Sequence, residues 1–149
     1  MRFLKTLIIF FFLFLFFNNK VFAYNMISLD EFYKKHSSDD KVAAIYAFER
    51  CSALYGLITQ FAPVEQKMEY IIAASVLTAH AIKFHSSVNK INEKNSEKKI
   101  LNNVEKLQNL YDEDSKTIFN KTGSRFGEYI SLDINFCNTV YIGLKNRLK

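Results

Sequence analysis

The sequence predicts an all-α fold, an antiparallel bundle of four main helices plus a short N-terminal helix, joined by one intramolecular disulfide. The chain of 149 residues contains one proline and four glycines, so it has few of the residues that form the turns of sheets and long loops. Apolar residues recur at helical spacing, and we find no alternating strand pattern of any length. The chain has two cysteines, and both fall within predicted helices. Together these observations favour a helical bundle.

The start of the chain predicts a secretory signal peptide. A short basic stretch precedes eleven uninterrupted apolar residues, Leu7 to Phe17, and a polar break then leads to Ala23. This three-part pattern predicts a cleaved signal peptide over 1–23 and a single helical-bundle domain over 24–149. We therefore expect an exported protein, periplasmic or secreted. The alternative is an uncleaved leader that tethers the bundle to a membrane, although a spanning helix needs roughly 20 apolar residues.

The net charge argues against a nucleic-acid partner. The whole chain carries a formal charge of +5, but residues 1–23 contain three basic residues and no acidic one. The remaining 126 residues carry about +2, which excludes a strongly basic nucleic-acid binder. We expect no nucleic-acid partner, and membrane contact only during export.

The first two helices have clear start signals. Ser28 and Glu31 have the spacing of a capping box, which predicts a short first helix. The polar stretch 37–40 ends that helix and caps a second one over about 40–61. Because the second helix is apolar nearly all round, we predict that it is the central and most buried helix.

A third helix is predicted over about 64–91, directly after Pro63. Its apolar residues follow one another at alternating spacings of four and three, which is typical of a bundle seam. The predicted seam consists of Tyr70, Ala74, Leu77, Ala81, Phe84, Val88 and Ile91.

The fourth helix is more amphipathic than the others. We expect it to begin near Asn95 or Ser96 and to end before Gly123, which is a good helix stop. Asp114 or Ser115 falls where the seam requires an apolar residue. The sequence therefore predicts a break in the helix at that point.

The fifth helix, over about 125–148, carries an acidic residue on its apolar side. Its predicted seam consists of Phe126, Ile130, Asp133, Cys137, Val140, Leu144 and Leu148. Asp133 and Cys137 are one helical turn apart, so both face the core. A buried carboxylate must be paired or change its ionisation state, which makes Asp133 a candidate site residue.

The two cysteines predict a disulfide with two charged neighbours. An even cysteine count in an exported chain favours a bridge between Cys51 and Cys137. Arg50 precedes Cys51, so its charge and that of Asp133 fall near the two ends of the bridge. The favoured interpretation is a structural ion pair between Arg50 and Asp133, with Tyr55 donating to the carboxylate. The alternatives are side chains that reach the surface, or a functional polar site inside the bundle.

Signatures of catalysis and of metal binding are absent from the sequence. His80 and His85 are five residues apart, so they cannot chelate a metal as a pair four apart would. Nucleophile elbows, phosphate-binding loops and dinucleotide-binding turns do not occur. We therefore assign no catalytic residue, expect no metal or cofactor, and interpret both histidines as structural.

These patterns favour a small exported protein that acts by binding or in a structural, accessory role. Its expected partner is an envelope protein, or a small apolar ligand held between the helices. The first alternative is a hydrolase-like enzyme that uses buried Asp133 as an acid or base. The second is a membrane-tethered accessory module that keeps its leader.

Overall fold

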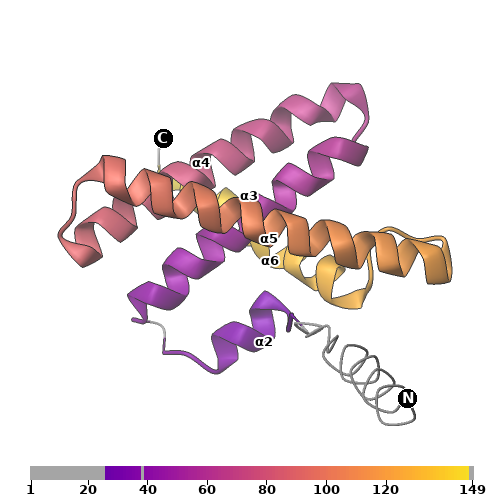
Figure 1. The fold of residues 1–149 in the computed structure, drawn as a ribbon, viewed down its shortest axis with the longest axis horizontal. Helices are drawn as coiled ribbons and strands as arrows, with labels where there is room; N and C mark the ends of the chain where they lie inside the picture. Colours follow the sequence, from indigo (N-terminus) through magenta and orange to yellow (C-terminus); the bar gives the residue numbers. More distant parts are fainter. Residues whose placement is uncertain (1–25, 38, 148–149) are drawn as a thin grey trace, which may run out of the picture.

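The computed structural model describes residues 26–37 and 39–147, so the predicted signal peptide lies outside the described residues. All regular secondary structure in this part of the chain is helical (Figure 1). The helices are α2 (Leu29–Lys34), α3 (Lys41–Phe61), α4 (Val64–Asn89), α5 (Glu93–Thr122) and α6 (Glu128–Arg147). The predicted all-α fold with four main helices and one short N-terminal helix is therefore confirmed.

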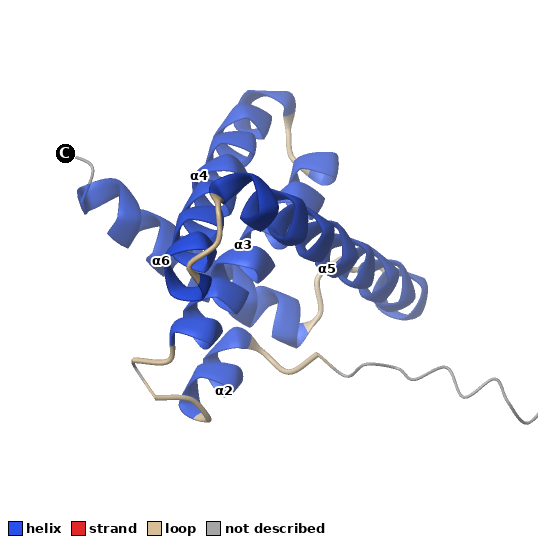
Figure 2. Cartoon of the chain, turned by 60° about the vertical axis from the view of Figure 1, so that its left-hand side comes forward, coloured by secondary structure: helices blue, strands red, loops and turns tan. Residues whose placement is uncertain are grey.

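Helix α3 is the centre of the fold, as predicted. It packs against α4, α5 and α6, while the short α2 packs against α6. In Figure 1, α3 and α4 form a helical hairpin and α5 crosses over α3. Together with the turned view in Figure 2, it places α2 at the end of the molecule opposite the α3–α4 connection. The core draws residues from all five of these helices, among them Leu29, Ala47, Cys51, Leu54, Leu57, Leu77, Tyr111, Ile130 and Cys137.

The helix starts follow the capping signals of the sequence. The Ser28 hydroxyl accepts a hydrogen bond from the Glu31 N–H at 3.2 Å, which begins α2. The Glu31 carboxylate instead pairs with Lys35 at 2.8 Å, so only half of the capping box forms. The Asp40 side chain accepts from two N–H groups in the first turn of α3. These side chains satisfy backbone donors that have no partner inside the helix.

The α4–α5 connection differs from the prediction by a few residues. Helix α4 ends two residues early, because Lys90 takes a left-handed conformation with φ of 55°. Ile91, predicted to lie on the buried seam, is exposed. Helix α5 begins ahead of the predicted Asn95 or Ser96, because the Asn92 side chain accepts a hydrogen bond from the Asn95 N–H at 2.8 Å. The spacing of apolar residues indicates neither the left-handed conformation of Lys90 nor the cap formed by Asn92.

The buried face of α4 is rotated slightly from the predicted seam. Leu77 and Ala81 are buried as expected. Ala73 and His85 complete this face, while Tyr70 is only partly buried. The small side chains on this face allow α3 to approach α4 closely.

Helix α5 is continuous, so the predicted break at Asp114 or Ser115 is wrong. Ser115 is fully buried, and its side chain is small enough to fit the seam. Asp114 lies beside the seam, where its carboxylate accepts a hydrogen bond from the Tyr129 hydroxyl at 2.5 Å. The helix ends at Gly123, whose φ of 73° is the left-handed conformation expected of a glycine stop.

Helix α6 begins at Glu128, three residues later than predicted. The preceding segment is held by Arg125, whose guanidinium lies 4.1 Å from the ring centroid of Phe61 and 4.7 Å from that of Phe119. This contact anchors the α5–α6 connection to the ends of α3 and α5. Leu148, the last residue of the predicted seam, lies outside the described residues.

Candidate functional site

The structure brings Arg50 and Asp133 together in a buried ion pair. Arg50 is 1% exposed and Asp133 is 0% exposed, and an Arg50 N–H donates to the Asp133 carboxylate. The Tyr111 hydroxyl donates to the same carboxylate oxygen and accepts from Arg50 Nε at 3.0 Å. One residue each from α3, α5 and α6 therefore meets in a single polar network.

The network also binds the backbone that leads into α2. The Leu29 N–H donates to Asp133 Oδ1 at 2.5 Å, and Arg50 Nη1 donates to the Ile27 carbonyl oxygen at 2.8 Å. Leu29 is the first residue of α2, where N–H groups have no acceptor within the helix. Asp133 supplies that acceptor, so both of its oxygens are hydrogen-bonded. The ion pair thus fixes the entry of the chain into α2.

Within the network, the Arg50 guanidinium stays charged and the Tyr111 hydroxyl stays neutral. Burial by itself would lower the pKa of Arg50, but Tyr111 and Asp133 outweigh that effect and the pKa is raised. Burial raises the pKa of Tyr111 well above its usual value, although Arg50 opposes the rise. Arg50 therefore stays protonated, and Tyr111 keeps the proton that it donates to Asp133.

The predicted disulfide is confirmed and lies next to this network. Cys51 and Cys137 are bonded, with 5.3 Å between their Cα atoms, and both are fully buried. Because Cys51 follows Arg50 and Cys137 lies one turn after Asp133, the covalent link and the ion pair join α3 to α6 at neighbouring points. This arrangement supports the structural interpretation of the pair. Asp133 is fully buried, whereas the hydrolase alternative requires it to reach a substrate.

Tyr55 has a different partner from the predicted one, and Tyr111 takes the place expected for it. The Tyr55 hydroxyl donates to Asn138 Oδ1 at 2.6 Å, not to Asp133. The sequence did not single out Tyr111, because a tyrosine on a helical seam is usual in a core. Its position opposite Arg50 depends on how α5 crosses α3, which the apolar pattern does not encode.

The two histidines of α4 have local partners. The Nδ1 atom of His85 lies 3.0 Å from the Ser96 hydroxyl, and that of His80 lies 2.9 Å from the Val76 carbonyl oxygen. Both contacts support the structural interpretation. Within the described residues, no group of three or more His, Cys, Asp or Glu side chains could hold a metal ion.

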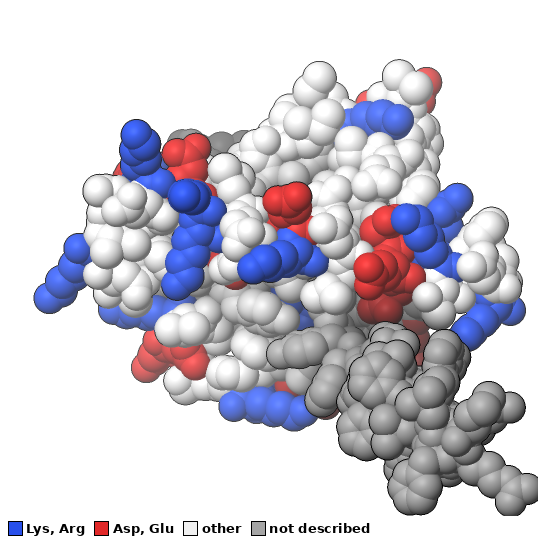
Figure 3. Space-filling view, viewed as in Figure 1, with Lys and Arg blue, Asp and Glu red and all other residues white. Residues whose placement is uncertain are grey.

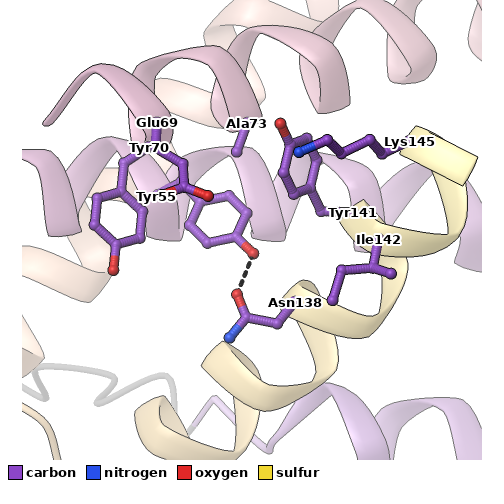
Figure 4. A pocket seen from close by; sticks show the side chains of 8 residues that line it. All are labelled: Tyr55, Glu69, Tyr70, Ala73, Asn138, Tyr141, Ile142 and Lys145. Carbon is purple, nitrogen blue, oxygen red and sulfur yellow. Dashed lines mark hydrogen bonds between the residues drawn. The ribbon is translucent and has the colours of Figure 1, made fainter. Parts of the chain in front are cut away.

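Tyr55 leads to a second candidate site, a groove between α4 and α6 (Figure 4). The groove has a volume of about 340 Å³. It is lined by Tyr55 from α3, by Glu69, Tyr70 and Ala73 from α4, and by Asn138, Tyr141, Ile142 and Lys145 from α6. We call it the tyrosine groove.

Three aromatic rings form a row along the tyrosine groove. The ring centroid of Tyr55 lies 5.8 Å from that of Tyr70 and 6.3 Å from that of Tyr141. Tyr55 is 1% exposed and forms the floor, while the other two rings are partly exposed. Glu69 and Lys145 are exposed, and neither has a hydrogen bond or ion pair within the described residues. The groove therefore offers aromatic faces and two unpaired charges of opposite sign.

Charges of both signs are mixed on the face that α5 crosses. Figure 3 shows lysine and acidic side chains interspersed along it, without a broad patch of one sign. No protein-family model matches this chain, and no curated protein or solved structure matches it either.

Proposed function

We propose that this protein acts by binding and that the tyrosine groove holds a small zwitterionic ligand. The observation that carries the proposal is the row of three tyrosine rings in a groove that also presents an unpaired carboxylate, Glu69, and an unpaired ammonium, Lys145. Ligand pockets of soluble proteins combine aromatic walls with a few converging polar groups. The groove volume of about 340 Å³ lies at the small end of the range for such pockets.

The α4 end of the groove favours a cation. A cation is attracted to the face of an aromatic ring when it lies within about 6 Å of the centroid. The partly exposed ring of Tyr70 lies at this end, and Glu69 adds a negative charge beside it (Figure 4). A substituted ammonium group suits this end, because it is weakly hydrated and has no strict hydrogen-bond geometry to satisfy.

The α6 end of the groove favours an anion. Lys145 supplies a positive charge, and Asn138 supplies amide donors. Because the Asn138 carbonyl oxygen already accepts from Tyr55, its N–H groups remain available to a ligand. A carboxylate or phosphate on the ligand would pair with both. These charged ends favour a zwitterion over the purely apolar ligand expected from the sequence.

Calorimetric titration with phosphocholine, glycine betaine and tetramethylammonium tests the proposal. We expect the two zwitterions to bind more tightly than the bare cation. Glu69→Gln and Tyr70→Ala should each weaken binding roughly tenfold, which corresponds to about 1.4 kcal/mol. Glu113→Gln, the same charge change on an exposed face of α5, should have no effect. Absence of binding for all three probes, or equal loss in the control variant, would overturn the proposal.

We also propose that the protein is exported and cleaved after Ala23. The confirmed bond between Cys51 and Cys137 supports this, because disulfides persist mainly in oxidising compartments. The mass of the chain recovered from an exporting host tests it directly. A mature chain that begins at Tyr24 is expected. A full-length chain that sediments with membranes would instead favour the tethered accessory module.

A further inference from the structure

Helix α4 has an exposed apolar face that is separate from the tyrosine groove. Val64, Met68, Ile71 and Ile72 are 79%, 62%, 45% and 48% exposed. They continue into exposed small residues on the same side of the helix, opposite the face that packs on α3. We call this face the outer stripe, and it consists of Val64, Met68, Ile71, Ile72, Ser75 and Ala79.

The outer stripe is suited to burial against another apolar surface. By length and composition α4 is apolar enough to cross a membrane, yet only 22% of its most apolar stretch is buried. Soluble monomers seldom expose a contiguous apolar face of this kind. The one polar side chain in the stripe, Ser75, donates its hydroxyl proton to the Ile71 carbonyl oxygen at 2.8 Å. Covering the stripe would therefore leave no donor without an acceptor.

The order of large and small residues identifies the partner. We propose that two copies of this chain pair through their outer stripes, antiparallel, about a two-fold axis between Ile71 and Ile72. In this register Ile71 of one copy faces Ile72 of the other. Met68 then faces Ser75, and Val64 faces Ala79. Each large side chain outside the centre meets a small one, so the stripe is complementary to itself, as a two-fold interface requires.

Charges at the edge of the stripe agree with the same register. Glu65 and Lys83 are eighteen residues apart, which is five helical turns, so they lie on the same edge of α4. In the antiparallel pair, Glu65 of one copy and Lys83 of the other lie on one side, separated by about 7.5 Å along the helix axis. Long side chains span that offset. Each copy would thus contribute Glu65 to one ion pair and Lys83 to a second, symmetric one.

The length of the stripe sets the expected strength of the dimer. From Val64 to Ala79 it extends about 22 Å, at 1.5 Å per residue. One helix pair of that length is smaller than a standard interface of about 1,600 Å². We therefore expect a reversible dimer with a dissociation constant on the order of micromolar, not a permanent one.

Sedimentation equilibrium between roughly micromolar and millimolar protein tests self-association. The unmodified chain should show a monomer–dimer equilibrium. Met68→Glu should raise the dissociation constant at least tenfold, because it places a carboxylate against Ser75 in an apolar interface. Leu101→Glu is the matched control, since Leu101 is 48% exposed on α5, outside the stripe. Circular dichroism establishes that both variants remain folded.

Single cysteines test the register. Cysteines introduced by Ile72→Cys lie next to the two-fold axis, so mild oxidation should link two copies rapidly. Those introduced by Val64→Cys are about 22 Å apart in the antiparallel pair and should not link. Linking of Val64→Cys at an equal rate would indicate a parallel pair and overturn the register. A chain that stays monomeric and instead binds vesicles of phosphatidylcholine and phosphatidylglycerol through the stripe would overturn the proposal.

Discussion

Removing the carboxylate of Asp133 should strongly destabilise the fold. Asp133→Ala leaves the Arg50 guanidinium without a counter-ion in the interior, where Arg50 is only 1% exposed. The variant also removes the acceptor of the Leu29 N–H and of the Tyr111 hydroxyl. Three donors in the interior thus lose their partner at once.

The expected loss follows from the chemistry of those donors. Breaking a buried ion pair by removing one partner costs about 3–5 kcal/mol, mostly from the charge that remains. A single buried donor without an acceptor costs about 1–3 kcal/mol. Because Arg50 still donates to the Ile27 carbonyl oxygen, the losses are not additive. We expect Asp133→Ala to lower the free energy of unfolding by about 4 kcal/mol.

Urea denaturation of the oxidised protein measures this loss. Asn135→Ala, an exposed substitution on the same helix, should change stability by less than about 0.5 kcal/mol. The double variant Arg50→Met with Asp133→Leu should recover at least half of the loss, because no unpaired charge remains. A neutral Asp133→Ala would refute the structural role of the pair. A double variant as unstable as the single one would refute the charge-burial argument.

Three further predictions use the same denaturation assay. Replacing both Cys51 and Cys137 by alanine should cost up to about 4–5 kcal/mol, because their bond closes a loop of 86 residues; an unchanged midpoint would contradict this. Burial lowers the pKa of His85, so stability should fall as the pH drops below 6.5, where the unfolded chain binds the proton first, and His85→Gln should reduce that decline. Gly56→Ala should stabilise α3 by about 0.5–1 kcal/mol, provided that the flexible Gln108 side chain moves away from the new Cβ.

The helices could be predicted because their signals are local. Asp40 caps α3 through its own side chain, and Gly123 ends α5 through its own backbone conformation. The predicted break in α5 was wrong because it assumed that any polar residue on the apolar seam interrupts the helix. Ser115 is small and buried, and its hydroxyl is the one buried side-chain polar atom without a partner among the described residues. The helix continues through Ser115 because this side chain is small enough to be buried, although it is polar.

The polar network was only half predictable. Arg50 and Asp133 could be singled out because each is a charge on an apolar face, and a buried charge requires a partner. Tyr111 and the Leu29 N–H could not be found in the same way. An aromatic residue on a seam and a backbone N–H are unremarkable until the crossing of α5 and the docking of α2 bring them to the carboxylate.

The tyrosine groove depends on the same attachment of α6. Helix α6 packs less extensively against α3 than α4 and α5 do, and it is fastened there by the disulfide and the ion pair. Its groove residues begin with Asn138, immediately after Cys137. Reduction of the disulfide should therefore loosen the α6 wall and weaken binding of a zwitterion, while α3, α4 and α5 keep their mutual packing. Binding that survives reduction unchanged would mean that the ion pair and α2 suffice to hold α6 in place.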